Sequence, residues 1–435
     1  MKPLCVISCP IDTFSGYGAR SRDFVKSLIQ LKDKEWDIKI MPQRWGDCPW
    51  NFISLDDPLR QRFIPGLQQT QQPDIWIQIT IPNEFQPVGK FNIGVSAGIE
   101  TTAYPADFIE GSNRMNLNLV SSNHSKQVAL NCTYEKTDAQ NNKVGVVKLE
   151  KPIEVLFEGL DLDIYNKNPQ NSGLLKDIHE DFCFLYTGHW LNGNLGEDRK
   201  NTGLMIKTFL ETFKGPGKKK PALILKTNQS NYSLLDREAI LSKINSLRGM
   251  VQGTLPNIYL IHGEMTDDEM NQLNNDNKVK AFVSFTKGEG YGRPLAEAAI
   301  TGKPVITSHW GGHLDFIHPD YNILIGGELK PVHPSAANQW LMKESQWFNI
   351  KTDIAGRAMK DLVKNYKKYW EKSRKQTQYL KDNWSFDKMT ERLNVFLPKV
   401  EASPKVQTLN LPKLKKSPKQ ILPKLKLPTL KKTEA

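Results

Sequence analysis

The chain has 435 residues, 39% of them hydrophobic and 24% charged, with a formal net charge of +12 at pH 7. This length suits two domains of roughly 200 residues each, and the composition is that of a folded globular protein. No apolar run approaches the ~18 residues that a membrane-spanning helix needs. The opening MKPLCVISCP has no cleavage-site pattern, so we expect a buried strand there and not a signal peptide.

The cysteines are few and scattered, at positions 5, 9, 48, 132 and 183. There is no C-x-x-C pair, and no spacing of His and Cys that is typical of a zinc site. Reduced thiols in a cytosol are the simplest interpretation, so we expect a cytoplasmic protein.

Short apolar segments alternate with helical periodicity in two successive series. The first series has candidate strands at 4–8, 74–81, 91–98, 117–122 and 152–159, with helical spacing of apolar residues from 24 to 31. The second has candidate strands at 182–188, 221–227, 257–263, 280–286 and 303–308, with helices at 203–213, after a capping box at Thr266 and Glu269, and after 292. This alternation predicts an α/β protein with two facing, Rossmann-like, doubly wound domains and a cleft between them.

The expected domain limits follow from the breaks in this pattern. An N-terminal domain spans 1–165, a second domain spans 166–355, and helices at 356–397 cross back to the first. The tail, 398–435, repeats a Leu-Pro-x-Leu-Lys theme and should be disordered with polyproline character. It is either a solvated extension or a basic arm that contacts anionic membrane, nucleic acid or an acidic protein, because residues 401–435 hold nine lysines and two glutamates.

The segment SFTKGEGYGRPLAEAAITGKPVITS, residues 284–308, has the residues of a ligand site at the carboxyl end of a strand. Its glycine loop allows close approach of a ligand, and Pro294 suits the first position of a helix whose amino end favours an anion. Glu289 and Glu297, eight positions apart, suit sugar hydroxyls better than phosphate. By itself this spacing is also compatible with an acidic loop and a solvated helix face.

Taken together, several motifs resemble those of the retaining GT-B glycosyltransferases, the glycosyltransferase family 4 (group 1) class. The segment 287–312 is similar to the family's EG-aromatic-G-x-P-x-x-E-A signature and the G-x-P-V-I that follows it. Residues 152–166 are similar to the linker between its domains, 187–209 to its first C-terminal-domain strand and following helix, and 98–126 to a segment of some members' N-terminal domain. The resemblance covers nearly all of residues 1–395 and implies transfer of a sugar from a nucleotide-sugar donor, with no metal.

The resemblance assigns a donor site residue by residue. Glu289 would grip the donor sugar and Glu297 the nucleotide ribose, while Lys200 would contact the diphosphate. The donor-binding residues would also include His189, the loop Gly290, Tyr291 and Gly292, and the first strand–helix turn with Gly16 and Gly18. Lys226 either adds charge there or is a strand-end lysine whose ammonium reaches solvent. Glu289, Lys200 and Arg199 would be the catalytic residues. The family often has an arginine where this chain has His189, which leaves Arg199 as a substitute.

Other candidates remain open. Glu100, Asp107 and His124 lie where the acceptor side of the cleft should be, as acceptor-binding or as structural residues. Asp161 and Asp163 have the form of a metal-binding D-x-D, but they belong to the linker, so we expect no metal there. The function expected from the resemblance is hexosyl transfer to an unknown acceptor. The alternatives are a glycosyltransferase that modifies DNA bases, or an inactive GT-B module that binds a glycan or a partner.

Overall fold

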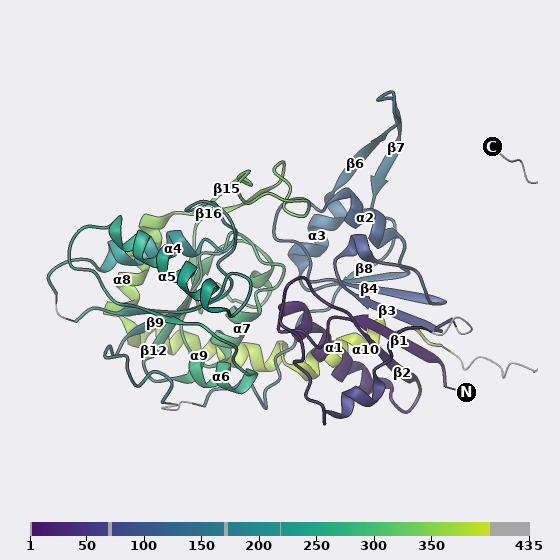
Figure 1. Ribbon diagram of the computed structural model, residues 1–435, viewed down its shortest axis with the longest axis horizontal. Coiled ribbons are helices and arrows are strands. Elements are labelled where there is room, and N and C mark those ends of the chain that lie inside the picture. The colour runs from purple at the N-terminus through teal and green to yellow at the C-terminus, as the bar shows by residue number, and fades with distance from the viewer. Residues whose placement is uncertain (1, 68–71, 169–172, 218, 401–435) are drawn as a thin grey trace, which may run out of the picture.

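The computed structural model describes residues 2–67, 72–168, 173–217 and 219–400, and folds them into two α/β domains side by side (Figure 1). The N-terminal domain holds a six-stranded parallel sheet in the order β2-β1-β3-β4-β5-β8. Its strands are β1 (Leu4–Cys9), β2 (Asp37–Pro42), β3 (Ile75–Ile79), β4 (Phe91–Val95), β5 (Leu117–Val120) and β8 (Ile153–Val155). Its helices are α1 (Gly16–Lys32), α2 (Ala106–Asn113) and α3 (Asn123–Asn131), with short turns η1 (Pro58–Arg62) and η2 (Pro82–Glu84).

The C-terminal domain holds a second six-stranded parallel sheet, in the order β11-β10-β9-β12-β13-β14. Its strands are β9 (Cys183–Thr187), β10 (Ala222–Lys226), β11 (Ile258–Ile261), β12 (Val279–Val283), β13 (Val305–Ser308) and β14 (Ile323–Ile325). The helices between them are α4 (Thr202–Phe213), α5 (Leu234–Gly249), α6 (Asp267–Asn275) and α7 (Arg293–Ile300), with the turn η3 (Gly312–Asp315). The α/β, twin-sheet architecture expected from the sequence is therefore confirmed.

The winding direction reverses in both sheets, because β1 lies between β2 and β3 and β9 lies between β10 and β12. Ligands of doubly wound sheets bind outside the carboxyl ends of the strands at such a reversal. The loops after β1, β9 and β12 are therefore the places where this fold can build a site.

The strands differ in places from the sequence-based expectations. β2 was not anticipated, because its sequence DIKIMP alternates polar and apolar residues at a sheet edge and its burial alternates too. β12 ends at Val283, three residues earlier than expected, so the chain from Ser284 onward already belongs to the loop that precedes α7. The capping box at the start of α6 is confirmed, with Thr266 and Glu269 bonding each other's backbone.

The final three helices link the domains (Figure 1). They are α8 (Thr352–Lys364), α9 (Tyr366–Asn383) and α10 (Phe386–Phe396). α9 packs against α7 in the C-terminal domain, and α10 packs against α1 in the N-terminal domain. Where the chain crosses, the backbone of Leu160 pairs with that of Ser385, so the linker and the crossing segment lie side by side.

Two antiparallel hairpins extend from the sheets. One, β6 (Thr133–Thr137) with β7 (Lys143–Lys148), projects away from the N-terminal domain (Figure 1). The other, β15 (Gly327–Pro331) with β16 (Gln346–Ile350), reaches from the C-terminal domain toward the N-terminal one. Thr102 and Gln346 exchange two hydrogen bonds of 2.9 Å there, and the Trp340 ring lies 5.2 Å from that of Phe108. This arm therefore bridges the domains.

All five cysteines are free thiols. None of the helices in the described ranges combines the length and the apolar character needed to cross a bilayer. The predictions for the basic tail concern residues that lie outside the described ranges, except for 398–400.

Candidate functional site

The loop after β12 brings both signature glutamates into the interior. Glu289 lies on the loop and Glu297 on α7, and each side chain is only 9% exposed. Gly292 caps α7 with φ of 98°, a left-handed conformation that costs little for glycine alone. Pro294 was expected at the first helical position, and the helix begins one residue earlier, at Arg293. The signature is thus a sharp turn that presents one carboxylate before the helix and one after its first turn.

Glu289 forms the centre of a cation cluster. Its Oε1 lies 2.6 Å from Nζ of Lys200, and its Oε2 lies 3.4 Å from Nη1 of Arg199. Arg199 also reaches Glu100 of the N-terminal domain, with Nη2 3.5 Å from Oε1. The backbone amide of Lys287 donates to the carbonyl of Arg199 over 2.8 Å, which holds the two loops together. Three sequence-predicted residues thus meet, and Glu100 joins them from across the cleft.

The charges in this cluster determine one another's pKa values. Burial alone would raise the pKa of Glu289, but Lys200 and Arg199 outweigh it and lower that pKa to about 2. Desolvation lowers the pKa of Lys200, although Glu289 opposes the shift. For Arg199, desolvation is outweighed by Glu100 and Glu289, so its pKa rises. Glu289 is therefore ionised at neutral pH and acts as the counter-ion of two buried cations.

Glu297 has different neighbours. Its Oε1 accepts a hydrogen bond of 2.9 Å from Nε of Arg293, one helical turn earlier. Burial raises the pKa of Glu297 to about 7, the Arg293 charge opposes this, and the nearby Asp267 carboxylate adds to it. Tyr165 of the linker lies against the same group and donates its hydroxyl to Asp267 over 2.9 Å. Glu297 therefore titrates in the physiological range.

The glycines of the loop are required by contact with the N-terminal domain. A Cβ on Gly288 would lie 1.9 Å from the carbonyl oxygen of Glu100, and one on Gly290 would lie 2.1 Å from that of Ala97. Any side chain here would force the domains apart. The loop after β4 and the loop after β12 therefore meet backbone to backbone, and the structure has its domains closed at this point.

The turn after β1 has one glycine fixed by packing and one that faces open space. A Cβ on Gly18 would lie 2.2 Å from the carbonyl oxygen of Thr13, whereas one on Gly16 would meet no atom within 4 Å. Ser15 caps α1 by accepting from the amide of Gly18. Of the two predicted residues, only Gly16 has room beside it.

His189 and Lys226 lie at the ends of β9 and β10. The pKa of the His189 imidazole is lowered by desolvation and by the charge of Lys200. Lys226 donates over 2.6 Å to the carbonyl of Gly263, and its ammonium lies 5.1 Å from the ring centroid of Tyr232. Burial lowers the pKa of Lys226 to about 8. Lys226 is thus engaged with its own domain.

The remaining predicted residues differ in placement. His124 begins α3 and meets Trp310 edge to face at 4.6 Å, and burial lowers its pKa to about 4. Asp107 is exposed in the first turn of α2. The Tyr291 side chain is buried and donates to the carbonyl of Glu158 over 2.6 Å, so it stabilises the linker.

The D-x-D pair of the linker caps a local turn. Asp161 accepts from the backbone amide of Asp163 over 3.1 Å, and its own carbonyl accepts from the amide of Tyr165 over 2.7 Å. Within the described ranges, no group of three or more His, Cys, Asp or Glu side chains is placed to hold a metal ion.

Sequence reasoning missed three residues that complete the site. Lys287 is buried beneath Trp347, with Nζ 4.6 Å from the ring centroid and 2.6 Å from the carbonyl of Gly196. His313 is fully buried beside Gly292 and contacts the carbonyl of Ser308 through Nε2 at 2.9 Å. Arg293 lies within the signature itself, and its i, i+4 spacing from Glu297 was a usable signal.

Solved glycosyltransferase structures have the same architecture. Sucrose-phosphate synthase from Thermosynechococcus elongatus matches with a TM-score of 0.61 at 10% identity, over 91% of this chain and 98% of that one. HepE from Anabaena in complex with UDP-glucose matches with a TM-score of 0.59 at 12% identity, over 90% and 98%. WaaG, a glycosyltransferase involved in lipopolysaccharide biosynthesis, matches with a TM-score of 0.55 at 13% identity, over 91% and 99%.

These similarities show the fold. No protein-family model and no curated protein sequence matches the chain. The chain has the GT-B fold of the glycosyltransferases, as the sequence motifs predicted.

Proposed function

We propose that the protein is a retaining glycosyltransferase of the family 4 (group 1) type that moves a hexose from a nucleoside-diphospho-sugar to an acceptor. The observation that carries this proposal is the buried cluster in which Lys200 and Arg199 face Glu289 beside the amino end of α7. Two cations and a helix amino end suit a diphosphate, and carboxylates at the two ends of the same turn suit the two sugars that flank it.

In this proposal, the cations serve the departure of the diphosphate. Breaking the bond between sugar and phosphate places negative charge on the leaving group and positive charge on the sugar ring. Lys200 and Arg199 stabilise the leaving group, and they are preorganised because Glu289 and Glu100 already hold them. When the diphosphate binds, it replaces Glu289 as the counter-ion of Lys200 and Arg199. The Glu289 carboxylate can then accept hydrogen bonds from the hydroxyls of the donor sugar.

The acceptor hydroxyl would attack the face from which the diphosphate leaves, giving retention, and the diphosphate takes the proton. Glu297 would hold the ribose hydroxyls, because a carboxylate accepts hydrogen bonds from a vicinal diol. The acceptor would enter from the N-terminal domain, where Glu100 contacts Arg199 and His124 packs on Trp310. His124 carries no charge at neutral pH, since burial lowers its pKa to about 4.

The test is a thermal-shift screen of the purified protein against UDP, GDP, ADP and their common sugar conjugates. UDP-glucose is the first probe, because the similar HepE structure contains it. A ligand that binds only the folded state at 100 times its Kd stabilises it by about 2.7 kcal/mol. Lys200→Met should abolish the shift, whereas Lys330→Met, at a lysine 57% exposed, should not.

Release of sugar or transfer to an added acceptor then distinguishes an enzyme from a binding module. A nucleotide that binds without turnover would favour the inactive module. If no nucleotide shifted the melting temperature, the donor-site assignment would be wrong.

A further inference from the structure

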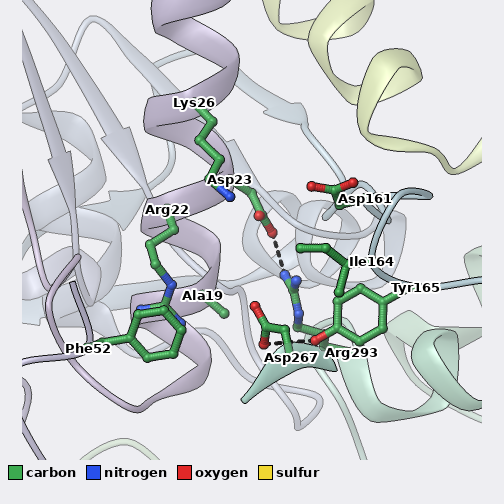
Figure 2. A pocket seen from close by; sticks show the side chains of 10 residues that line it. All are labelled: Ala19, Arg22, Asp23, Lys26, Phe52, Asp161, Ile164, Tyr165, Asp267 and Arg293. Carbon is green, nitrogen blue, oxygen red and sulfur yellow. Dashed lines mark hydrogen bonds and ion pairs between the residues drawn. The ribbon is translucent and has the colours of Figure 1, made fainter. Parts of the chain in front are cut away.

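Arg293 joins three separate parts of the chain at one buried point. It begins α7, its side chain is 13% exposed, and its Nε bonds Glu297 in the same helix. Its Nη1 lies 2.5 Å from Oδ2 of Asp23 on α1 of the N-terminal domain, and 3.8 Å from Oε2 of Glu158 in the linker. Figure 2 shows the guanidinium between α1 and Tyr165, with its contact to Asp23 drawn. The Arg293 guanidinium therefore contacts both Glu297, the carboxylate proposed to bind the ribose, and Asp23 of the N-terminal domain.

The pair of Arg293 and Glu297 has the i, i+4 spacing common on helix surfaces, and this pair needs no partner across the cleft. The contact between Arg293 and Asp23 is instead a nearly buried ion pair between the domains, since the Arg293 side chain is 13% exposed and that of Asp23 is 11% exposed. Removing one partner of a buried ion pair leaves a charge without its counter-ion, which is strongly unfavourable away from water. The ion pair with Asp23 therefore depends on the two domains being together.

The surroundings favour a coupling role over a further ligand site. The cavity beside Arg293 has a volume of about 40 Å³, enough for one or two water molecules and too small for a nucleotide. Arg22 lines the same cavity with its guanidinium stacked on Phe52, 3.4 Å from the ring centroid, as Figure 2 shows. The charges nearest Arg293 are therefore the carboxylates that it already binds.

We propose that Arg293 is a positioning residue that couples the orientation of Glu297 to closure of the domains. With the domains together, Nη1 is held by Asp23 and Nε by Oε1 of Glu297, which fixes the plane of the guanidinium and leaves Oε2 of Glu297 outside this pair. With the domains apart, Arg293 loses Asp23 and can take both oxygens of Glu297 in a bidentate pair. A nucleoside diphosphate then binds the closed arrangement better, and its binding favours closure. This inference rests on the proposed function.

The decisive variant is Asp23→Asn, which keeps the shape of the side chain and leaves the pair of Arg293 and Glu297 intact. The matched control is Asp33→Asn at the end of the same helix, where the carboxylate is 48% exposed and binds Arg62. The measurements are the Kd for UDP, the donor KM and kcat, and the radius of gyration with and without UDP.

We expect Asp23→Asn to raise the Kd for UDP and the donor KM about 5- to 10-fold, to change kcat less than 2-fold, and to enlarge the radius of gyration of the free protein. Asp33→Asn should match the wild type. Equal UDP affinity in Asp23→Asn and wild type would overturn the coupling while leaving the proposed function in place, even if the variant melted earlier. Failure of the wild type to bind UDP, GDP or ADP would overturn the proposed function, and the coupling with it.

Discussion

Glu289 and Glu297 are eight residues apart and equally buried, yet their environments are opposite. Glu289 faces Lys200 and Arg199, and its pKa falls to about 2. Glu297 shares a single arginine with Asp23 and lies near Asp267, and its pKa rises to about 7. The comparison teaches that a motif can place two carboxylates, but that residues from distant parts of the chain decide which of them is charged.

The largest expected effect comes from removing the charge of Glu289. Glu289→Gln leaves Lys200 and Arg199 without their closest counter-ion, so the free energy of unfolding at pH 7 should fall by about 3 kcal/mol. Sugar transfer should fall at least ~100-fold, since the same carboxylate is proposed to grip the donor sugar. Urea denaturation and a transfer assay measure the two effects. Glu328→Gln, at a carboxylate 61% exposed, is the control, and a variant as stable and active as this control would contradict the assignment.

Glu297→Gln should affect binding more than turnover. Nucleotide Kd should rise about 10-fold, equivalent to ~1.4 kcal/mol. In the wild type, affinity should improve from pH 6 to pH 8, because the ionised carboxylate is the better acceptor for ribose hydroxyls and its pKa is about 7. Titration calorimetry across this range measures both, and a pH profile in the variant that parallels the wild type would argue against Glu297 as the titrating group.

The two glutamates should also give opposite dependences of stability on pH. The folded-state pKa of Glu289 is depressed from 4.5, so its contribution is present above pH 4.5 and is lost as pH falls toward about 2. The pKa of Glu297 is raised, so its penalty is absent below pH 4.5 and grows as pH rises through about 7. Urea midpoints of the two Gln variants, each compared with the wild type from pH 2 to pH 8, should therefore change with opposite slopes, between pH 2 and 4.5 for Glu289 and between pH 4.5 and 7 for Glu297. Slopes of the same sign would be inconsistent with these environments.

The smallest expected effect is at the residue between the two glutamates. Tyr291→Phe removes the hydroxyl that donates to the carbonyl of Glu158 and keeps the ring on Phe316 at 4.7 Å. Stability should fall by about 1 kcal/mol, and nucleotide affinity should stay within 2-fold of the wild type. A large loss of affinity would mean that the Tyr291 hydroxyl contacts the donor and does not only hold the carbonyl of Glu158.

Much of the fold could be predicted from the sequence, because strands buried in a parallel sheet are short apolar runs and amphipathic helices alternate with them. The edge strand β2 and the β15–β16 arm escaped this reasoning. Polar and apolar residues alternate in β2, and its position is shown by its contacts with the sheet. β15 is mostly exposed, and the position of the arm is shown by the hydrogen bond between Thr102 and Gln346. The family pattern predicted separate donor-binding roles for Lys200 and Glu289, while their 2.6 Å contact could not be foreseen.

By itself, the sequence determined the two domains and the turn that carries Glu289, Gly292 and Glu297, since local spacing is enough to define a strand, a glycine loop and a helix start. Only the tertiary structure decided that Glu100 joins Arg199, that Asp23 joins Arg293, and that one glutamate is charged and the other titrates near neutral pH. The physical reason is that pKa values and ion pairs depend on distances across the cleft. The partners lie 99 residues apart in one pair and 270 residues apart in the other, and no local pattern encodes such a distance.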